Sequence, residues 1–315
     1  MQRLKDNDFI DLYIGNDYVE IKGLSGASSF ISEIPDYLAE DVEKLKESCI
    51  QQFNKIGNTE FSVFYDDRLY RVTVTLFRGI NLIIRQTPAG VLPIERIPLS
   101  SALRMSIEAP HVTGLFLIAG AMCSGKTTSA ASVLSRRIAF TGNLGVSIED
   151  PIETVLMGRH GEGRCIQLEV SGEETYASAT KKAFRMGASS FLLGEIRDGA
   201  TAHEVLKASL SMFVVSTIHA SSVPEAIERY IMFCEEFNAG AKNHVANTLY
   251  VVAHQVMNTV SADNRISRRS VEISGFNLRH ATCVDTIRAK ISAGNLKSLS
   301  DQFKSIAYDF PGNSR

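Results

Sequence analysis

Apolar residues near the start of the chain recur every three or four positions, which is the spacing of one face of a helix. The positions are Leu38, Val42, Leu45, Cys49 and Phe53. Asp36 stands just ahead of this face, where an aspartate can cap the helix. Three strand-like runs follow at Phe61–Tyr65, Tyr70–Phe77 and Asn81–Ile84. The short spacing between these runs predicts an antiparallel meander, so residues 1–90 are expected to form a small α+β domain.

The pattern changes after about residue 105, where apolar runs of strand length alternate with helical stretches. The runs are Leu115–Ala119, Gly145–Ile148, Phe191–Leu193 and Met212–Ile218. Such alternation is typical of a mostly parallel sheet with helices on both faces. The segment Gln86–Pro98 holds three prolines and one glycine. We therefore expect a linker at 91–104 and an α/β domain at 105–315.

The sequence GAMCSGKTT at 120–128 follows the first of these apolar runs directly. It fits the phosphate-loop pattern G-x-x-x-x-G-K-[ST], in which glycines let backbone N–H groups approach phosphate oxygens. Lys126 would neutralise the β- and γ-phosphates, and Thr127 would place its hydroxyl on Mg²⁺. The nucleotide-binding residues that this pattern predicts are Gly120, Ala121, Met122, Cys123, Ser124, Gly125, Lys126, Thr127 and Thr128.

Acidic and histidine side chains follow the later apolar runs. Glu149 and Glu153 come after the second run, Glu195 ends the third, and His219 ends the fourth. A lone residue of either kind at a strand end is more often solvated or structural than functional. All of them follow the phosphate loop in order, however, and ligands of open α/β sheets bind at the carboxyl ends of the strands. This order favours a metal-dependent nucleotide site.

Composition narrows the function classes. The chain has 315 residues, 44% of them hydrophobic and 22% charged, which is typical of a globular protein of two domains. A net charge of −2 argues against direct nucleic-acid binding. No apolar run reaches about 18 residues, so no membrane span is expected, and the charged start does not resemble a secretory signal. The five cysteines form no C-x-x-C pair, which fits reduced thiols in the cytoplasm, and we expect Cys123 to be a small buried residue.

Motifs along most of the chain resemble one family. They are DLYI (11–14), IEDPIE (148–153), QLEV (167–170), GEET (172–175), LGEIRD (193–198), STIHAS (216–221) and TIRAKISAGNLKSL (286–299). The sequence resembles the type II/type IV secretion ATPase superfamily, most of all the type IV pilus retraction ATPases (the PilT family) and the related type IVB secretion and conjugation ATPases. The resemblance implies a RecA-like P-loop NTPase domain after a small PAS-like α+β domain.

The resemblance also implies roles for individual residues. ATP and Mg²⁺ are the expected ligands, with Thr127 and Glu195 near the metal. Glu153 is the best candidate for the general base that positions the attacking water, with Glu149 beside it. His219 would sense the γ-phosphate.

In the small domain, Arg71, Arg78 and Arg85 could reach the nucleotide of a neighbouring subunit, where a guanidinium stabilises charge on the γ-phosphate. The alternative is that they are solvent-facing residues of the meander. The resemblance implies a homo-hexameric ring in the cytoplasm, peripheral at the inner membrane, whose partners are platform or secretion-channel proteins.

Two departures from the family pattern leave alternatives open. Ser189 stands where the family carries an aspartate, and Leu168 stands where it prefers an arginine. The first interpretation is a pilus retraction motor. The second is the traffic ATPase of a conjugation or type IVB secretion system, and a third is a nucleotide-binding regulator that does not hydrolyse ATP.

Overall fold

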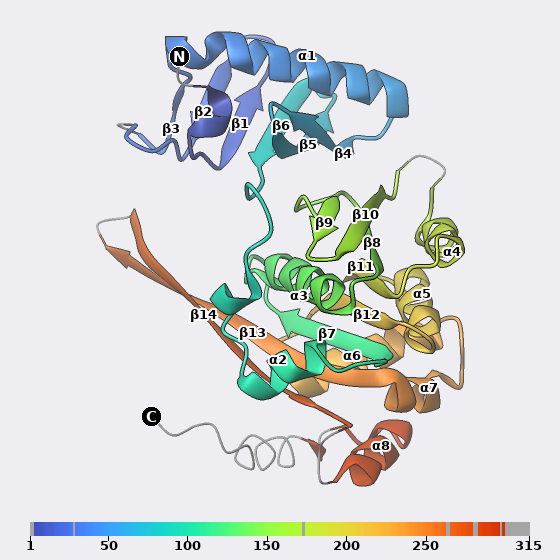
Figure 1. The fold of residues 1–315 in the computed structure, drawn as a ribbon. Helices are drawn as coiled ribbons and strands as arrows, with labels where there is room; N and C mark the ends of the chain where they lie inside the picture. Colours follow the sequence, from blue (N-terminus) through green and yellow to red (C-terminus); the bar gives the residue numbers. More distant parts are fainter. Residues whose placement is uncertain are drawn as a thin grey trace. The chain divides into compact units, whose positions relative to one another are not determined.

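A computed structural model describes residues 3–27, 29–171, 174–262, 265–279, 283–296 and 298–299. The chain forms two compact units, coloured by sequence in Figure 1, which are described separately below. The small unit comprises Met1–Gly90, Asp150–Val155 and Glu169–Thr175. The large unit comprises Val91–Glu149, Leu156–Leu168 and Tyr176–Arg315. Two residues of the GEET motif, Gly172 and Glu173, lie outside the described residues.

The small unit is a six-stranded antiparallel sheet with one long helix packed on it, α1 (Ala39–Ile56). The strands are β1 (Asp11–Ile14), β2 (Val19–Lys22), β3 (Ile31–Glu33), β4 (Glu60–Tyr65), β5 (Arg68–Thr75) and β6 (Asn81–Gln86). Their order is β3-β2-β1-β6-β5-β4, and every neighbouring pair is antiparallel. The predicted meander β4–β5–β6 is confirmed.

The apolar face of α1 packs into the core of the small unit through Val42, Leu45 and Cys49, as its spacing predicts. Asp36, however, does not cap α1. It begins a 3₁₀ turn, η2 (Asp36–Leu38), and the N-cap of the helix is Leu38, which makes no side-chain capping bond. The expectation of an aspartate cap was wrong because the chain makes this extra turn after Pro35 before the helix starts.

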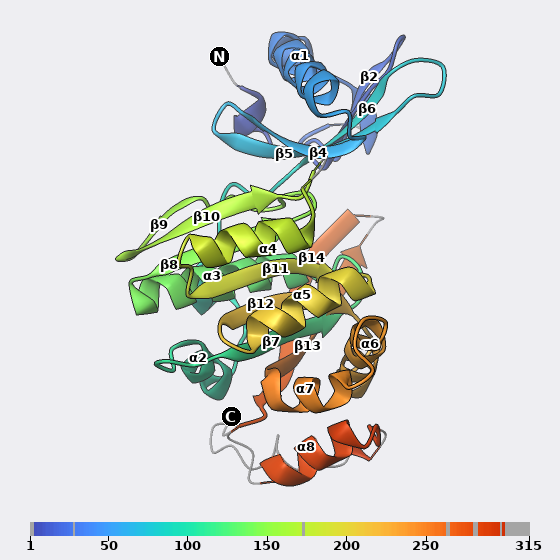
Figure 2. The same ribbon diagram turned by 90° about the vertical axis from the view of Figure 1, so that its right-hand side faces the viewer.

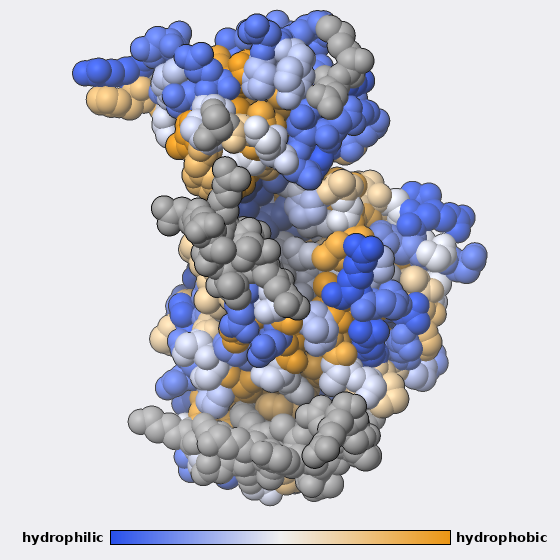
Figure 3. All heavy atoms as spheres, turned by 90° about the vertical axis from the view of Figure 1, so that its left-hand side faces the viewer, coloured by the Kyte–Doolittle hydropathy of each residue, from blue (hydrophilic) through white to orange (hydrophobic). Residues whose placement is uncertain are grey.

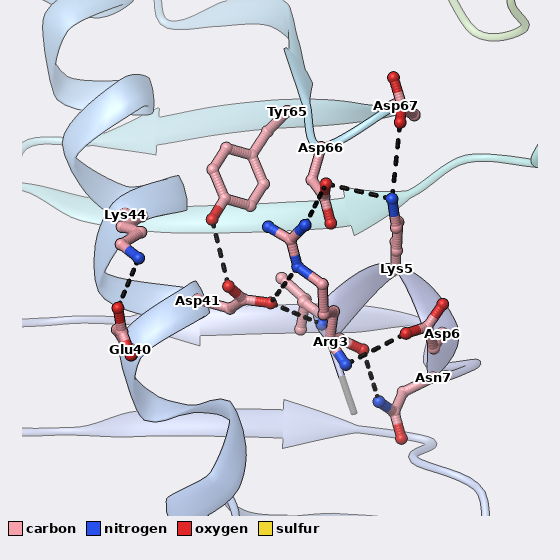
Figure 4. Close-up of polar contacts among 11 residues, drawn as sticks. Arg3, Lys5, Asp6, Asn7, Glu40, Asp41, Lys44, Tyr65, Asp66 and Asp67 are labelled. Atoms are coloured by element: carbon pink, nitrogen blue, oxygen red, sulfur yellow. Dashed lines mark hydrogen bonds and ion pairs between the residues drawn. The ribbon is translucent and has the colours of Figure 1, made fainter. Parts of the chain in front are cut away.

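Charged side chains hold the start of the chain against the β4–β5 turn (Figure 4). Arg3, the N-cap of the short turn η1 (Leu4–Asp6), and Lys5 within it pair with Asp66 at 3.0 and 3.2 Å. Asp41 of α1 accepts a bond from the Leu4 N–H. These contacts join the first residues, α1 and the meander.

The large unit has an eight-stranded sheet of order β14-β13-β7-β12-β11-β8-β10-β9. The strands are β7 (Gly114–Gly120), β8 (Leu144–Glu149), β9 (Gly158–His160), β10 (Gly163–Glu169), β11 (Ser190–Ile196), β12 (Phe213–His219), β13 (Leu249–Ala262) and β14 (Arg265–Asn277). The five strands β13, β7, β12, β11 and β8 are parallel, as the alternating pattern predicts. β7 is buried along its whole length, so its near-continuous apolar run is that of a central strand.

Helices cover both faces of this sheet, as Figures 1 and 2 show. One face carries α2 (Ser101–Ile107) and α3 (Lys126–Thr141). The other face carries α4 (Tyr176–Arg185), α5 (Gly199–Ser209) and α6 (Val223–Glu235). Two further helices, α7 (Ala241–Thr248) and α8 (Val284–Ser292), contact each other near β13.

Residues 91–104, which we expected to be a linker, belong to the large unit. Ile94, Ile97 and Leu99 are buried in the core between α3 and the sheet, and Ile94 lies in the short turn η3 (Ile94–Arg96). The prolines of this segment indicate a break in regular structure, but the apolar residues between them give it a core to join.

The hairpin β13–β14 extends beyond the rest of the sheet in Figure 1. β13 pairs with β7 as far as Gln255, which lies opposite Gly120, and with β14 as far as Ala262. Apolar and polar residues are interspersed on the face drawn in Figure 3. In the described part of the chain, no helix is long and apolar enough to cross a bilayer.

Candidate nucleotide site

The predicted phosphate loop connects the end of β7 to the start of α3, which begins at Lys126. Glycine is required at both ends of the loop. A Cβ on Gly120 would lie 2.4 Å from the backbone oxygen of Gln255, and Gly125 has φ +87°, which L side chains rarely adopt. The loop therefore combines a close backbone approach with a left-handed turn at the helix start.

The amino end of α3 is suited to an anion. Its N-cap, Gly125, offers no side-chain oxygen to the first N–H groups of the helix, which leaves these donors and the positive end of the helix dipole for a ligand. The Ser124 hydroxyl is buried and has no hydrogen-bond partner among the described residues. An unsatisfied buried hydroxyl beside uncapped N–H groups fits a phosphate that would accept hydrogen bonds from both.

Lys126 lies folded over the loop and is 6% exposed. Its Nζ donates to the Ala121 oxygen at 2.9 Å and lies 3.3 Å from His219 Nδ1, at the end of β12. His219 Nε2 lies 2.5 Å from Glu195 Oε1 on β11, and Arg197 Nε donates to Glu195 Oε2 at 2.9 Å. Three stretches of sequence that we singled out separately thus meet in one network.

The partners of His219 indicate its tautomer. An ammonium group has no acceptor, so Lys126 donates to Nδ1, which leaves the imidazole proton on Nε2 facing the Glu195 carboxylate. In this arrangement His219 accepts from the loop lysine, and its Nε2 lies close to Glu195 Oε1, which has no hydrogen bond among the described residues. His219 therefore lies between Lys126 and Glu195 and contacts both.

Glu149, at the end of β8, is 3% exposed. Its Oε1 accepts from the Ser147 hydroxyl and from Gln167 Nε2, the latter at 3.2 Å. Gln167 Oε1 in turn accepts from the N–H groups of Leu156 and Met157, at 2.6 and 2.7 Å. These bonds hold Glu149 in a buried network. Through Gln167, this network connects Glu149 to the backbone of Leu156 and Met157.

Glu153 belongs to the small unit together with the rest of Asp150–Val155. Arg71 Nη1, on β5, donates to its Oε1 at 2.5 Å. Glu169 holds the same segment, because its Oε2 accepts from the Ile152 N–H at 3.1 Å and from the Ser62 hydroxyl on β4. The acidic motif IEDPIE is thus divided between the two units after Glu149.

The other two candidate arginines have different surroundings. Arg85 on β6 lies opposite Arg71 in the sheet register, and its Nε donates to Asp11 Oδ1 at 2.8 Å. Arg78 lies in the turn between β5 and β6, with its guanidinium 5.6 Å from the ring centre of Phe77. The structure therefore brings Arg71 into contact with an acidic candidate, whereas Arg85 pairs with the buried Asp11.

Ser189 precedes the first residue of β11, and its N–H donates to the Leu144 oxygen. Six residue steps of about 3.3 Å separate this position from Glu195, so the two lie about 20 Å apart, at opposite ends of the strand. The departure from the family pattern at Ser189 therefore does not remove a ligand from the vicinity of Glu195.

Cys123 is exposed, so the expectation of a buried residue was wrong. It sits at φ +59° in the loop, turned away from the core. Three other cysteines are buried, and burial raises the pKa of the thiols of Cys49, Cys165 and Cys234 to about 12. Two thiol environments thus coexist in one chain.

The loop and strand ends also fit Mg²⁺, which proteins hold with one or two oxygen ligands together with substrate phosphates. Thr127 follows Lys126 in the first turn of α3, and the carboxylate of Glu195 lies beside His219. No group of three or more His, Cys, Asp or Glu residues that could hold a metal was found in the described ranges. A site of this kind would take its remaining ligands from the nucleotide and from water.

Sequence reasoning missed the amide residues that support these groups. Gln167 holds Glu149, and Gln255 Nε2 donates to the Ser124 oxygen at 2.6 Å. Gln167 lies in the QLEV motif, so the sequence did contain a signal that this residue has a role in the site. For Gln255 the sequence offers no local signal, because its partner is 131 residues away.

Comparisons with known proteins identify the family of the chain. Residues 96–296, more than half of the chain, match the family described as Type II/IV secretion system protein. The chain is 27% identical over 251 residues to the type IV pilus retractation ATPase PilT of Pseudomonas aeruginosa, covering 77% of this chain and 71% of that protein. Other alignments cover as little as 24% of the relative.

Solved structures show the same fold. The crystal structure of the pilus retraction motor PilT with bound ADP has a TM-score of 0.72 at 22% identity, covering 94% of this chain and 86% of that one. The ATPase DotB of Legionella pneumophila has a TM-score of 0.71 at 21% identity, covering 93% and 84%. The expected α/β fold with a small antiparallel domain is therefore confirmed.

Proposed function

Because the chain belongs to the Type II/IV secretion system protein family, we propose that it is a motor ATPase that hydrolyses Mg²⁺-ATP to drive type IV pilus retraction. The observation that carries this proposal is the network Lys126–His219–Glu195 at the phosphate loop. It supplies a cation for the phosphates, an acid for the metal and a histidine that links the two.

Binding would begin at the loop. The N–H groups at the start of α3 and the Ser124 hydroxyl are donors for the β- and γ-phosphates. Lys126 would exchange its bond to the Ala121 oxygen for the phosphate oxygens, which attract an ammonium group more strongly than a carbonyl does.

Mg²⁺, held by Thr127 and Glu195, would neutralise charge on the phosphates. Glu153 would position the attacking water as general base. Arg71 donates to its Oε1, and since a carboxylate has four lone-pair sites, the remaining ones could accept a proton from water while this pair holds the side chain.

The working form would be a homo-hexameric ring in the cytoplasm at the inner membrane, with membrane platform proteins as partners. This part of the proposal is supported by the similarity to PilT, whose curated description is a pilus retraction ATPase. Arg71 and Arg78 are the candidates for contacts with a neighbouring subunit's nucleotide.

Phosphate release by the purified chain with ATP and Mg²⁺, with light scattering to give the mass, tests the proposal. We expect turnover that depends on Mg²⁺ and a mass of six chains with ATP. Nucleotide binding without turnover, alone and with membranes of the host, would instead identify a non-hydrolysing regulator.

The traffic ATPase of a conjugation or type IVB secretion system is the second candidate. Leu168, in place of the arginine expected for retraction ATPases, favours it. Deletion of the gene in its host separates the two candidates. Loss of surface motility with normal DNA transfer and secretion supports the retraction motor, and the reverse supports the traffic ATPase.

A further inference from the structure

Gln255 lies on β13 beneath both glycines of the phosphate loop. Its backbone oxygen would be 2.4 Å from a Cβ on Gly120, and its Nε2 would be 3.0 Å from a Cβ on Gly125. The side chain is 1% exposed. It is also the last residue of β13 that pairs with β7 in the sheet register, opposite Gly120.

The carboxamide of Gln255 makes one directed contact, from Nε2 to the Ser124 oxygen at 2.6 Å. Because a carbonyl can only accept, this bond fixes which end of the amide faces the loop. In a planar trans peptide the C=O and the next N–H point in opposite directions. Holding the Ser124 oxygen against Gln255 therefore turns the Gly125 N–H away from β13, toward the open side of the loop.

The oxygen of the same amide makes no stabilising hydrogen bond within the described residues. Gln255 Oε1 is buried and has no hydrogen-bond partner among the described residues. A buried acceptor without a donor is unfavourable, so an apolar side chain of similar shape would suit the fold better at this position. The bond to the Ser124 oxygen is therefore the hydrogen bond that this buried amide makes within the described residues.

We infer that Gln255 is a positioning residue for phosphate binding, which sets the Ser124–Gly125 peptide so that the Gly125 N–H is presented to the β-phosphate. The inference rests on the proposed function, since it concerns the same loop. It assigns a role to β13, which lies outside the phosphate loop and the strand-end motifs LGEIRD and STIHAS.

Gln255→Met tests the inference, because methionine keeps the length of the side chain and removes the donor. The matched control is Asn258→Met, which removes an exposed amide three residues along the same strand that bonds Glu272. The measurement is affinity for ADP and for AMP, which lacks the β-phosphate. We expect Gln255→Met to bind ADP about tenfold more weakly, as one lost hydrogen bond implies, with AMP affinity and the control unchanged.

Gln255→Glu adds a second measurement, the pH dependence of ADP affinity, which a purely structural role of Gln255 would not change. Its protonated carboxyl can donate to the Ser124 oxygen, whereas its carboxylate repels that oxygen, and burial raises the pKa of a carboxyl. We expect ADP affinity close to that of the parent at pH about 6 and at least tenfold weaker at pH about 9. If Gln255→Met does not fold, this pH series decides the question.

Three outcomes would overturn the inference: a folded Gln255→Met variant with the ADP affinity of the parent, equal losses for ADP and AMP, or a Gln255→Glu variant with the pH profile of the parent. A parent chain that binds no nucleotide overturns the proposed function and this inference together. A parent that binds, beside a Gln255→Met variant that binds equally, overturns the inference alone.

Discussion

His219 Nε2 lies 2.5 Å from Glu195 Oε1, and these two residues end the neighbouring parallel strands β12 and β11. The contact places the imidazole of His219 between the loop lysine and the acid that would hold the metal. One ring nitrogen of His219 faces each partner. A rotation of the His219 side chain alone could therefore couple a movement of Lys126 to Glu195. The predictions below depend on this network and on the groups around it.

Replacement of His219 should affect turnover more than binding. Asparagine at 219 is too short to reach both partners, so we expect kcat to fall about tenfold to a hundredfold with ATP affinity changed less than threefold. Steady-state hydrolysis and equilibrium ATP binding provide the two numbers. His111→Asn, at an exposed histidine with φ +51°, is the control, and a large loss of binding in His219→Asn would argue against a linking role.

Lys126→Ala should abolish nucleotide binding. The substitution removes the ammonium that reaches from α3 over the loop, and a charge-assisted contact to phosphate is among the stronger ones available. Titration with a fluorescent ADP analogue should show an affinity at least a hundredfold weaker. The control is Lys44→Ala, at an exposed position of α1, which should bind the analogue as the parent does. Parental affinity in Lys126→Ala would show that the phosphate-loop assignment is wrong.

Glu195→Gln should retain nucleotide but lose hydrolysis. The amide keeps the size of the side chain, but it is a poorer ligand for Mg²⁺. We expect turnover to fall more than a hundredfold and ADP affinity in the absence of Mg²⁺ to stay within about threefold. Turnover close to that of the parent would exclude Glu195 from the metal site.

The Arg71–Glu153 pair should matter for turnover and little for stability. Both side chains are about 30% exposed, and pairs of this kind contribute about 1 kcal/mol or less to folding. We expect Arg71→Gln and Glu153→Gln each to lower hydrolysis at least tenfold, with melting temperatures within a few degrees of the parent. If melting changes strongly and turnover per folded chain does not, the pair is structural.

Alkylation at pH 8 should distinguish the cysteines. Thiolate is the reactive form, and a pKa of about 12 in place of 9.0 lowers its population at Cys49, Cys165 and Cys234 about a thousandfold. Iodoacetamide followed by peptide mass spectrometry should find native Cys123 labelled and these three labelled only after denaturation. ADP should protect Cys123, since the thiol lies in the loop that would enclose the phosphates.

Most of the secondary structure was predictable because it depends on local patterns. The helix face at Leu38–Phe53, the meander and four strands of the large sheet all follow from residue spacing within short windows. The Asp36 cap and the linker were not predicted correctly, because each depended on packing. Pro35 starts an additional turn before α1, and Ile94, Ile97 and Leu99 join a core built by strands far along the chain.

The candidate site was partly predictable for the same reason. Contiguous motifs place Lys126, Glu195 and His219 at the ends of strands, and parallel strands end at one edge of a sheet. Which of these side chains meet depends on strand order, and the adjacency of β7, β12 and β11 was not apparent from the residues. Glu149 resembles Glu153 in the sequence, yet one is buried against Gln167 and the other pairs with Arg71.

The chemistry of this protein follows from a short stretch of sequence: two glycines in a loop, with a lysine and a threonine in the first turn of the next helix, can bind a polyphosphate because all of the donors lie within nine residues. The partner of each group depends instead on how the distant strands come together. The contacts between Gln255 and Ser124, between His219 and Glu195, and between Arg71 and Glu153 join residues 24 to 131 positions apart. Such contacts depend on strand order and register, which the whole core sets together.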